Sequence, residues 1–212
     1  MEIWALSTTC DSAWAFGWDS LVAIGTLSAV LVSIFVAIFL PFVREHRRRP
    51  QLSLTYTEPS DIVQEHLESK IIARFRLRVE AARGKEEARG VGVFVESVSE
   101  RIAEGIRAPL LAGGQPLRVS YADHTTQTVP AGASRFFDLV ELCRLPGMET
   151  SAKLPLAGSS VDLRPRTSYH LQLSVTGANF DSLAFTSEVV WKGELDPNGF
   201  PQEALAVTVY PE

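Results

Sequence analysis

Histidine, cysteine and carboxylate side chains supply most acid–base, nucleophilic and metal-binding chemistry in proteins, and in this chain they are scattered. None of the histidines has another histidine or a cysteine at a recognised metal-ligand spacing. Glu65 and Glu68 flank one of them and could approach a cation, although an exposed polar face is the blander alternative. The four histidines are His46, His66, His124 and His170. Their spacing predicts no metal site.

The sequence also lacks the motifs of common catalysts. It contains no Gly-x-Ser-x-Gly elbow, no phosphate-binding glycine-rich loop and no His-Glu-x-x-His helix. Cys143 lies beside Arg144, whose charge would favour a reactive thiolate, but a single cysteine near a strand end is more often a packing residue. Cys10 is distant and offers no disulfide framework. We therefore expect no catalytic residue and no cofactor, and a protein that is not an enzyme.

One charged pattern stands out on a predicted strand. Arg74, Arg76 and Arg78 alternate with Phe75 and Leu77, so the three guanidinium groups should project from one face at intervals of about 6.5–7 Å. One interpretation is a docking surface for an acidic partner or for the inner leaflet of a membrane. The other is a solvated outer face with glutamates on neighbouring strands.

The element that locates the chain is an uncharged run, Leu21–Val43, in which 18 of 23 residues are hydrophobic. A helix of this length reaches roughly 34 Å, enough to cross a hydrocarbon core of about 30 Å. We expect a transmembrane helix over residues 20–43, with Pro41 in its last turn. A cleaved signal peptide is the alternative, but it would have a basic N-terminal region and a shorter apolar core.

The basic residues beside this run predict its orientation. Arg44, Arg47, Arg48 and Arg49 follow it, whereas no lysine or arginine precedes it. The positive-inside rule then makes residues 1–19 an extracytoplasmic tail, 44–50 a basic linker and 51–212 a cytoplasmic domain at the inner (plasma) membrane. Trp14 and Trp18 would lie at the outer interface, and the arginines could meet anionic headgroups.

Small residues recur at every fourth position of the apolar run. Gly25, Ala29, Ser33 and Ala37 form a stripe of the kind that lets two membrane helices approach closely. Homo-oligomerisation through this face is one interpretation. Coincidence is the other, because small residues are common in membrane helices.

Composition and charge narrow the function further. The chain is 46% hydrophobic with a net charge of −5, too apolar for a disordered protein and, with a pI near 5.5, unlike a dedicated nucleic-acid binder. The charge divides into −3 for residues 1–19, +3 for Arg44–Arg49 and −5 for the remainder. The predicted partners are therefore the lipid bilayer and an unidentified protein, with no nucleic acid.

Beyond Pro50 the hydrophobic pattern has a period of two. About eight strands are expected, separated by Gly- and Pro-containing turns, and they indicate an antiparallel β-sandwich of the immunoglobulin-like type. A helix is expected at Ser60–Ser69 and a short turn at Ser99–Ile106. The expected strands include Leu52–Thr57, Phe75–Val79, Val91–Val98, Leu117–Ala122, Phe136–Leu142, Tyr169–Val175, Leu183–Trp191 and Leu205–Val209.

Two stretches resemble known proteins. Arg76–Glu80, Arg83–Lys85 and Ala88–Val95 together resemble a strand–turn–strand of CARDB-like and related immunoglobulin-like modules, except that Ala81 or Ala82 stands where those modules have Asn. Leu171–Val175 through Trp191 is similar to the last strands of small bacterial single-pass membrane proteins of unknown function. These resemblances imply a sandwich fold and a membrane anchor, and no catalytic residue.

The sequence therefore predicts a mainly β protein with one transmembrane helix, acting as a membrane-anchored binding or scaffolding protein. Two alternatives stay open: an oligomeric membrane effector or pore subunit assembled through the small-residue stripe, and a membrane-tethered hydrolase.

Overall fold

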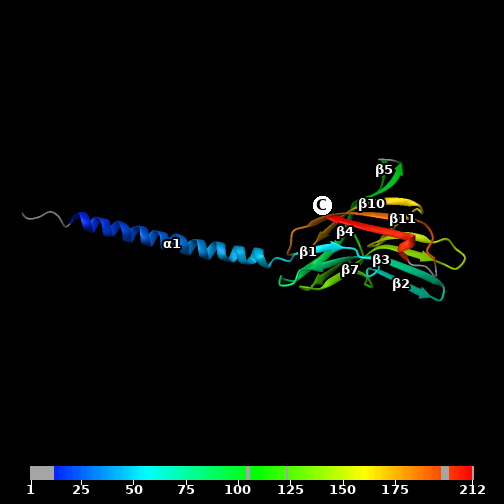
Figure 1. Cartoon of the computed structure of the whole chain (residues 1–212), viewed down its shortest axis with the longest axis horizontal. Helices are drawn as coiled ribbons and strands as arrows, with labels where there is room; N and C mark the ends of the chain where they lie inside the picture. Colours follow the sequence, from blue (N-terminus) through cyan, green and yellow to red (C-terminus); the bar gives the residue numbers. More distant parts are fainter. Residues whose placement is uncertain (1–11, 104–105, 123, 197–200, 212) are drawn as a thin grey trace, which may run out of the picture. The chain divides into compact units, whose positions relative to one another are not determined.

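The computed structural model describes residues 12–103, 106–122, 124–196 and 201–211, and their side chains except those of 12–20, 102–103 and 106–107 (Figure 1). The chain divides into two compact units, Met1–Arg48 and Arg49–Glu212. The first unit is a helix and the second is built mainly of strands. The mainly β class with an N-terminal helix is confirmed.

Helix α1 spans Ser12–Arg48, so it continues past the predicted end at Val43. Its segment Leu21–Arg48 has a window with mean hydropathy 2.6 and no buried side chains, which fits a membrane span or a signal sequence. The expectation that Pro41 lies in the last turn is wrong, because the helix continues for seven more residues. His46, Arg47 and Arg48 occupy the real last turn, where positive charge favours the helix dipole.

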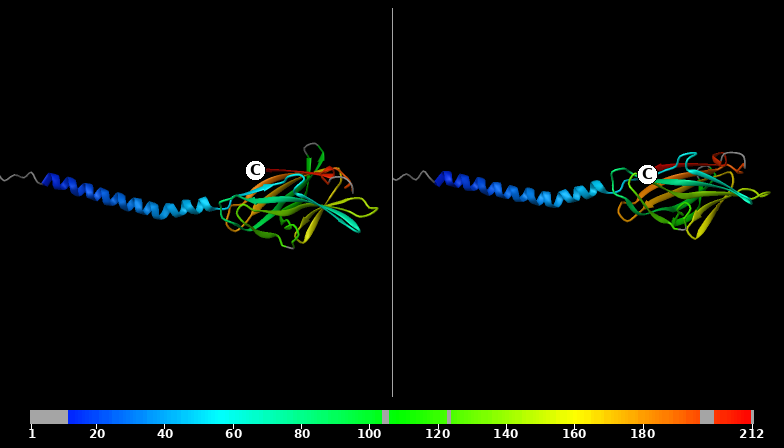
Figure 2. Two further views of the ribbon diagram at one scale, coloured as in Figure 1. Left: turned by 60° about the horizontal axis from the view of Figure 1, so that its bottom comes forward. Right: turned by 90° about the horizontal axis from the view of Figure 1, so that it is seen from below.

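The second unit consists of two antiparallel six-stranded sheets packed face to face (Figure 2). The first sheet has the order β1-β3-β7-β8-β9, with β2 also pairing to β3; the second has the order β12-β11-β10-β4-β5, with β6 also pairing to β4. The first sheet comprises β1 (Leu52–Thr55), β2 (Ile62–Leu67), β3 (Lys70–Ala81), β7 (Ser134–Arg144), β8 (Ser151–Leu156) and β9 (Ser159–Leu163). The second comprises β4 (Ala88–Ala103), β5 (Ile106–Pro116), β6 (Thr126–Val129), β10 (Thr167–Thr176), β11 (Leu183–Trp191) and β12 (Leu205–Pro211), and the short helix α2 is Pro201–Ala204.

Part of the pairing order resembles that of an immunoglobulin-type sandwich, but the outer neighbour of β7 is β8, which follows β7 in the chain, whereas strand D precedes strand E in that fold. The pairs β3–β7, β4–β10 and β10–β11 correspond to the B–E, C–F and F–G neighbours of that fold. At the start of β10, the hydroxyl of Tyr169 bonds to the backbone of Arg164, five residues earlier, as in the tyrosine corner of such sandwiches. The sandwich predicted from the alternating pattern is confirmed, although it has more strands than the eight expected.

The core lies between the sheets and is made by alternate residues of the central strands. Phe75, Leu77 and Val79 of β3 have no exposed surface, nor do Val91, Val93 and Val95 of β4. Leu171, Leu173 and Val175 of β10 are about as deeply buried. This inward set is the one that the period-two pattern predicts, because successive side chains of a strand point to opposite faces.

Segment Leu117–Ser120 connects the two sheets. Leu117 N–H donates to Val93 O of the second sheet at 2.8 Å, and Ser120 N–H donates to Phe136 O of the first at 3.0 Å. The strand expected at Leu117–Ala122 is therefore wrong: the segment makes only isolated bridges, Leu117 with Leu156 and Val119 with Phe137. Its backbone bonds are shared between the sheets, so no ladder can form.

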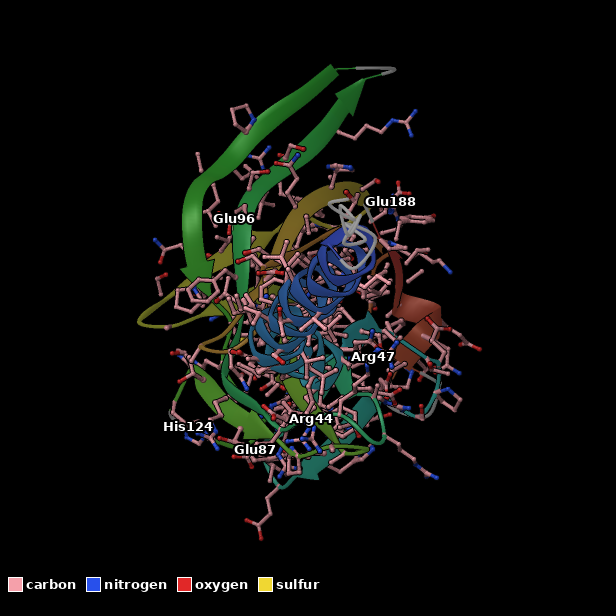
Figure 3. All side chains as sticks on the ribbon, turned by 90° about the vertical axis from the view of Figure 1, so that its left-hand side faces the viewer. Arg44, Arg47, Glu87, Glu96, His124 and Glu188 are labelled. Carbon is pink, nitrogen blue, oxygen red and sulfur yellow. The ribbon has the colours of Figure 1, made fainter. Side chains whose placement is uncertain are left out.

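Two further local expectations are wrong. The helix expected at Ser60–Ser69 is strand β2, which pairs residue for residue with β3 from Ile62 opposite Phe75 to Leu67 opposite Lys70. The turn expected at Ser99–Ile106 is largely strand, because β4 continues to Ala103 and β5 begins at Ile106. There the β4–β5 hairpin projects beyond the rest of its sheet (Figure 3), since β10 pairs with β4 only as far as Glu100.

Candidate functional site

The three arginines of β3 lie on the outer face of the first sheet. Arg74, Arg76 and Arg78 are each partly buried and alternate with inward-facing Phe75 and Leu77, as predicted. Their neighbours come from three separate segments: β2 and the loop before it, β7, and the crossing segment Leu117–Ser120.

Arg74 is held between two strands. Its Nη1 lies 2.8 Å from Glu65 Oε1 on β2, and its Nε lies 3.2 Å from Glu141 Oε2 on β7. The register accounts for the second contact, because Arg74 and Glu141 are paired directly across β3 and β7. Burial acts to lower the pKa of Arg74, but Glu65 and Glu141 outweigh it, and the pKa is raised above its ordinary value. This arginine stays charged and links β2 to β7 through two of its nitrogens.

Arg78 forms a largely buried ion pair. Its Nη2 bonds to Oδ1 of Asp61, a residue with no exposed surface, and also to the hydroxyl of Ser60 at 2.8 Å. The other Asp61 oxygen accepts the backbone N–H of Thr57 at 2.8 Å, which closes the loop between β1 and β2. The hydrogen bond that Arg78 donates to Asp61 is the main reason why the pKa of Arg78 is raised. Glu80 contributes a looser contact at 3.5 Å.

Arg76 lies over an aromatic ring. Its guanidinium carbon is 4.3 Å from the centre of the Phe136 ring, within the range of a cation–π contact. The carboxylate of Asp138 is close enough to interact with it electrostatically and bonds to the hydroxyl of Ser120. Burial raises the pKa of Asp138, and the Ser120 hydrogen bond, Arg74 and Arg76 only partly offset this effect.

The geometry bears on the two interpretations of the arginine triplet. Five carboxylates surround three guanidinium groups: Asp61, Glu65, Glu80, Asp138 and Glu141. A surface with this balance has no excess positive charge to offer an acidic partner or anionic headgroups. The arrangement is the one expected of an outer face with acidic residues on neighbouring strands, and these arginines join β2, β3 and β7.

The remaining candidate residues for chemistry stay apart. Within the described ranges, no group of three His, Cys, Asp or Glu side chains could hold a metal ion. His66 Nε2 lies 3.1 Å from the amide nitrogen of Gln64, and His124 is exposed. Cys143 is half-buried on β7 and is a free thiol. The second cysteine, Cys10, lies outside the described residues.

The predicted membrane-associated residues lie on or next to α1. Gly25, Ala29, Ser33 and Ala37 are exposed along the helix, and the Ser33 hydroxyl donates to its own helix backbone at Ala29 O, 2.8 Å away. Arg44, Arg47 and Arg48 lie in the helix, whereas Arg49 follows it and pairs with Asp181 at 3.7 Å. Trp14 and Trp18 are in the helical backbone, but their side chains lie outside the described set.

One surface was not predicted from the sequence. A shallow groove of about 390 Å³ lies between the β2–β3 turn and the β7–β8 loop, and Leu67, Ile71, Leu145 and Pro146 line it. Leu67 and Leu145 are 49% and 41% exposed, and neighbouring Met148 is 63% exposed. One feature of the sequence indicates this surface: the turn at Leu145–Met148 reads Leu-Pro-Gly-Met and is apolar, whereas turns usually contain polar residues.

Comparison with known proteins adds no assignment. No protein-family model matches the chain, and no curated protein matches it. A function must therefore be argued from the helix and the surfaces of the sandwich.

Proposed function

We propose that the chain is a single-pass membrane protein whose β-sandwich is a cytoplasmic protein-binding module. The observation that carries this proposal is the helix surface: from Leu21 to Val43 every side chain is exposed, and nearly all of them are apolar. Leaving such a surface in water is unfavourable by about 25 cal/mol per Å² of apolar area. A bilayer of about 30 Å removes that area from water.

The residues around the helix end support an anchor over a cleaved signal sequence. The helix continues through Arg44, Arg47 and Arg48, a basic cluster typical of the cytoplasmic side of a span. Gln51 already accepts a hydrogen bond from Ala82 N–H at 2.9 Å, so the sandwich begins within three residues of the helix end. Such a tether would keep the domain beside the membrane that holds the helix.

The binding role rests on what the sandwich contains. On the outer face of the first sheet, carboxylates of the same domain balance the positive charges of Arg74 and Arg78. The described residues form no metal cluster. A β-sandwich can bind a partner through its end loops and sheet edges without catalytic residues. This supports recognition of another protein and gives no support to the hydrolase alternative.

Fractionation tests the anchor. A chain tagged at its N-terminus should remain in the membrane pellet after washing at alkaline pH, with the tag still attached. Release of a tagged chain into the supernatant would contradict the anchor, and loss of the tag from a secreted domain would identify a signal sequence.

Cysteine labelling tests the orientation. In a Cys143→Ser background, Cys10 should react with an impermeant maleimide in intact cells. In a Cys10→Ser/Cys143→Ser background, Glu86→Cys, at an exposed turn, should react only after lysis. The opposite pattern would reverse the proposed topology.

The oligomeric effector makes a different prediction from the same helix. Replacing Gly25 and Ala29 with leucine keeps the span apolar but fills the small-residue stripe. If the stripe assembles a pore, the particle purified in detergent should become smaller. A binding module on a monomeric anchor should keep its size.

A further inference from the structure

Two turns lie side by side at one end of the sandwich. The β2–β3 turn contains Glu68 and Ser69, and the β7–β8 loop follows Arg144. Strands β3 and β7 are paired with Ile71 opposite Arg144, so the register brings the two turns together. In Figure 1 the end of β2 and the start of β3 lie at the end of the domain away from β1.

These turns hold an unusual share of the exposed apolar surface of the domain. Among the described residues of the sandwich, six large hydrophobic side chains are exposed. Leu67 immediately precedes the β2–β3 turn, and Leu145 and Met148 belong to the β7–β8 loop. The other three are dispersed over the surface: Leu110, Tyr121 and Tyr210. A cluster of exposed apolar side chains around a groove is typical of an interaction site, whereas isolated ones need no explanation.

The charges of the groove point to its occupant. Lys70 and Arg144 line it beside a single carboxylate, Glu68, although the domain as a whole carries a net charge of −5. Arg144 Nη1 donates to Leu195 O at 2.6 Å, which fixes the guanidinium at this end of the sandwich. A complementary partner would therefore bring apolar side chains together with carboxylates.

The groove has a defined place within the sandwich. Strand β3 carries Lys70 at one end and Ala81 at the other, and Ala81 is paired with Leu52, the first residue of β1. Twelve extended residues span roughly 36–40 Å. The groove is thus at the end of the sandwich opposite the one where the chain enters β1.

We propose that this groove binds an apolar peptide segment bearing acidic residues, presented by a partner protein. The inference deepens the proposed binding function by naming its surface and the chemistry of its partner. Leu67 and Leu145 would pack against the apolar side chains, and Lys70 and Arg144 would meet the carboxylates.

The test uses the full chain in phosphatidylcholine nanodiscs and three fluorescein-labelled ten-residue peptides. Each peptide has two leucines three positions apart in a serine–glycine background, with four glutamates, four glutamines or four lysines. Fluorescence anisotropy should show the tightest binding for the glutamate peptide and the weakest for the lysine peptide. Leu145→Glu should weaken binding of the glutamate peptide by roughly tenfold or more, as expected for a buried anchor contact.

Two variants control for charge and for folding. Lys70→Glu should reduce or reverse the preference for the glutamate peptide over the lysine peptide. Leu110→Glu is the matched control, because Leu110 is 39% exposed against 41% for Leu145 but lies on β5. It should leave binding unchanged, and both leucine variants should keep the melting temperature of the parent chain.

Three results would overturn the proposal: equal binding of the three peptides, a Leu145→Glu chain that binds like the parent, or a parent dimer that Leu145→Glu converts to a monomer. The last result would identify a second copy as the occupant. The two proposals can fail separately. If the membrane anchor is wrong, the fractionation experiment shows it, and that result does not depend on the order of the peptide affinities.

Discussion

Replacing Asp61 with alanine is expected to destabilise the sandwich strongly, although this residue is far from the groove. Its carboxylate has no exposed surface and holds three groups: the Arg78 guanidinium, the Ser60 hydroxyl and the Thr57 N–H. Alanine would remove all three contacts at once and leave the Arg78 charge without its main partner. The loop between β1 and β2 would lose the bond that closes it.

The expected loss of stability depends on the contacts that Arg78 and Thr57 keep after the substitution. Removing one partner of a buried ion pair typically costs about 3–5 kcal/mol. Arg78 keeps Glu80 at 3.5 Å and is 23% exposed, so its share falls toward the lower end of that range. An unsatisfied Thr57 N–H adds about 1 kcal/mol unless water reaches it. We expect Asp61→Ala to lower the free energy of unfolding by about 3–4 kcal/mol, the larger value applying if water does not reach the Thr57 N–H.

Urea unfolding in detergent measures this value, with Trp191 of the sandwich, 3% exposed, as the fluorescent reporter. Glu80→Gln is the matched control, because Glu80 contacts the same arginine but is 46% exposed, and it should cost less than about 0.5 kcal/mol. In a double-mutant cycle, Asp61→Ala and Arg78→Met should be coupled by at least about 1.5 kcal/mol. A loss below about 0.5 kcal/mol for Asp61→Ala, or additive effects, would refute the assignment of this pair.

Three other substitutions test separate features. Burial raises the pKa of Asp138, so the folded chain holds this proton to higher pH than the unfolded chain, and stability falls as the pH rises above the ordinary pKa of an aspartate. The free energy of unfolding of Asp138→Asn relative to the parent should therefore rise as the pH increases above about 4. A difference that does not change with pH would contradict this. Tyr169→Phe should cost about 1–2 kcal/mol in urea unfolding, because the backbone N–H of Arg164 loses its acceptor; no change would show that water replaces the hydroxyl. Gly177→Ala should lower the melting temperature, because the new Cβ would lie 2.2 Å from the Phe180 ring and 2.9 Å from a backbone oxygen. Gly114→Ala is the control and should be nearly neutral, because its Cβ would meet the flexible Glu96 carboxylate. Equal changes in melting temperature for the two variants would be inconsistent with the packing.

The strands that could be predicted are those whose pattern is local. In β3 and β10 the alternation of apolar and polar residues is enough to identify both the strand and its inward face. The sequence favours a helix at Ser60–Ser69 because Ser60 and Asp61 are residues typical of a helix cap. In the fold, Asp61 accepts the N–H of Thr57 and pairs with Arg78, 17 residues along the chain, and no local pattern reveals that contact.

The same limit applies to the candidate surfaces. The alternation predicted that Arg74, Arg76 and Arg78 share one face, but not which of the two interpretations holds. That depends on register: Glu141 is 67 residues from Arg74 in sequence and faces it only because β3 and β7 pair as they do. The apolar groove likewise arises from two turns brought together by this pairing.

The order of the strands has a consequence for biosynthesis. The central strand β4 ends at Ala103, whereas its neighbour β10 begins at Thr167, more than sixty residues later. At a synthesis rate of about 5–20 residues per second, the ribosome needs roughly 3–13 s to add the residues between β4 and β10. During this time one edge of β4 lacks its native partner. During that interval β5 and β6 are the only native pairing partners of β4 that have been synthesised. The run Val91–Val95 of β4 contains no charged residue and is a candidate for chaperone binding or misassociation. The yield of folded protein should therefore depend on translation rate and chaperone supply more than on equilibrium stability.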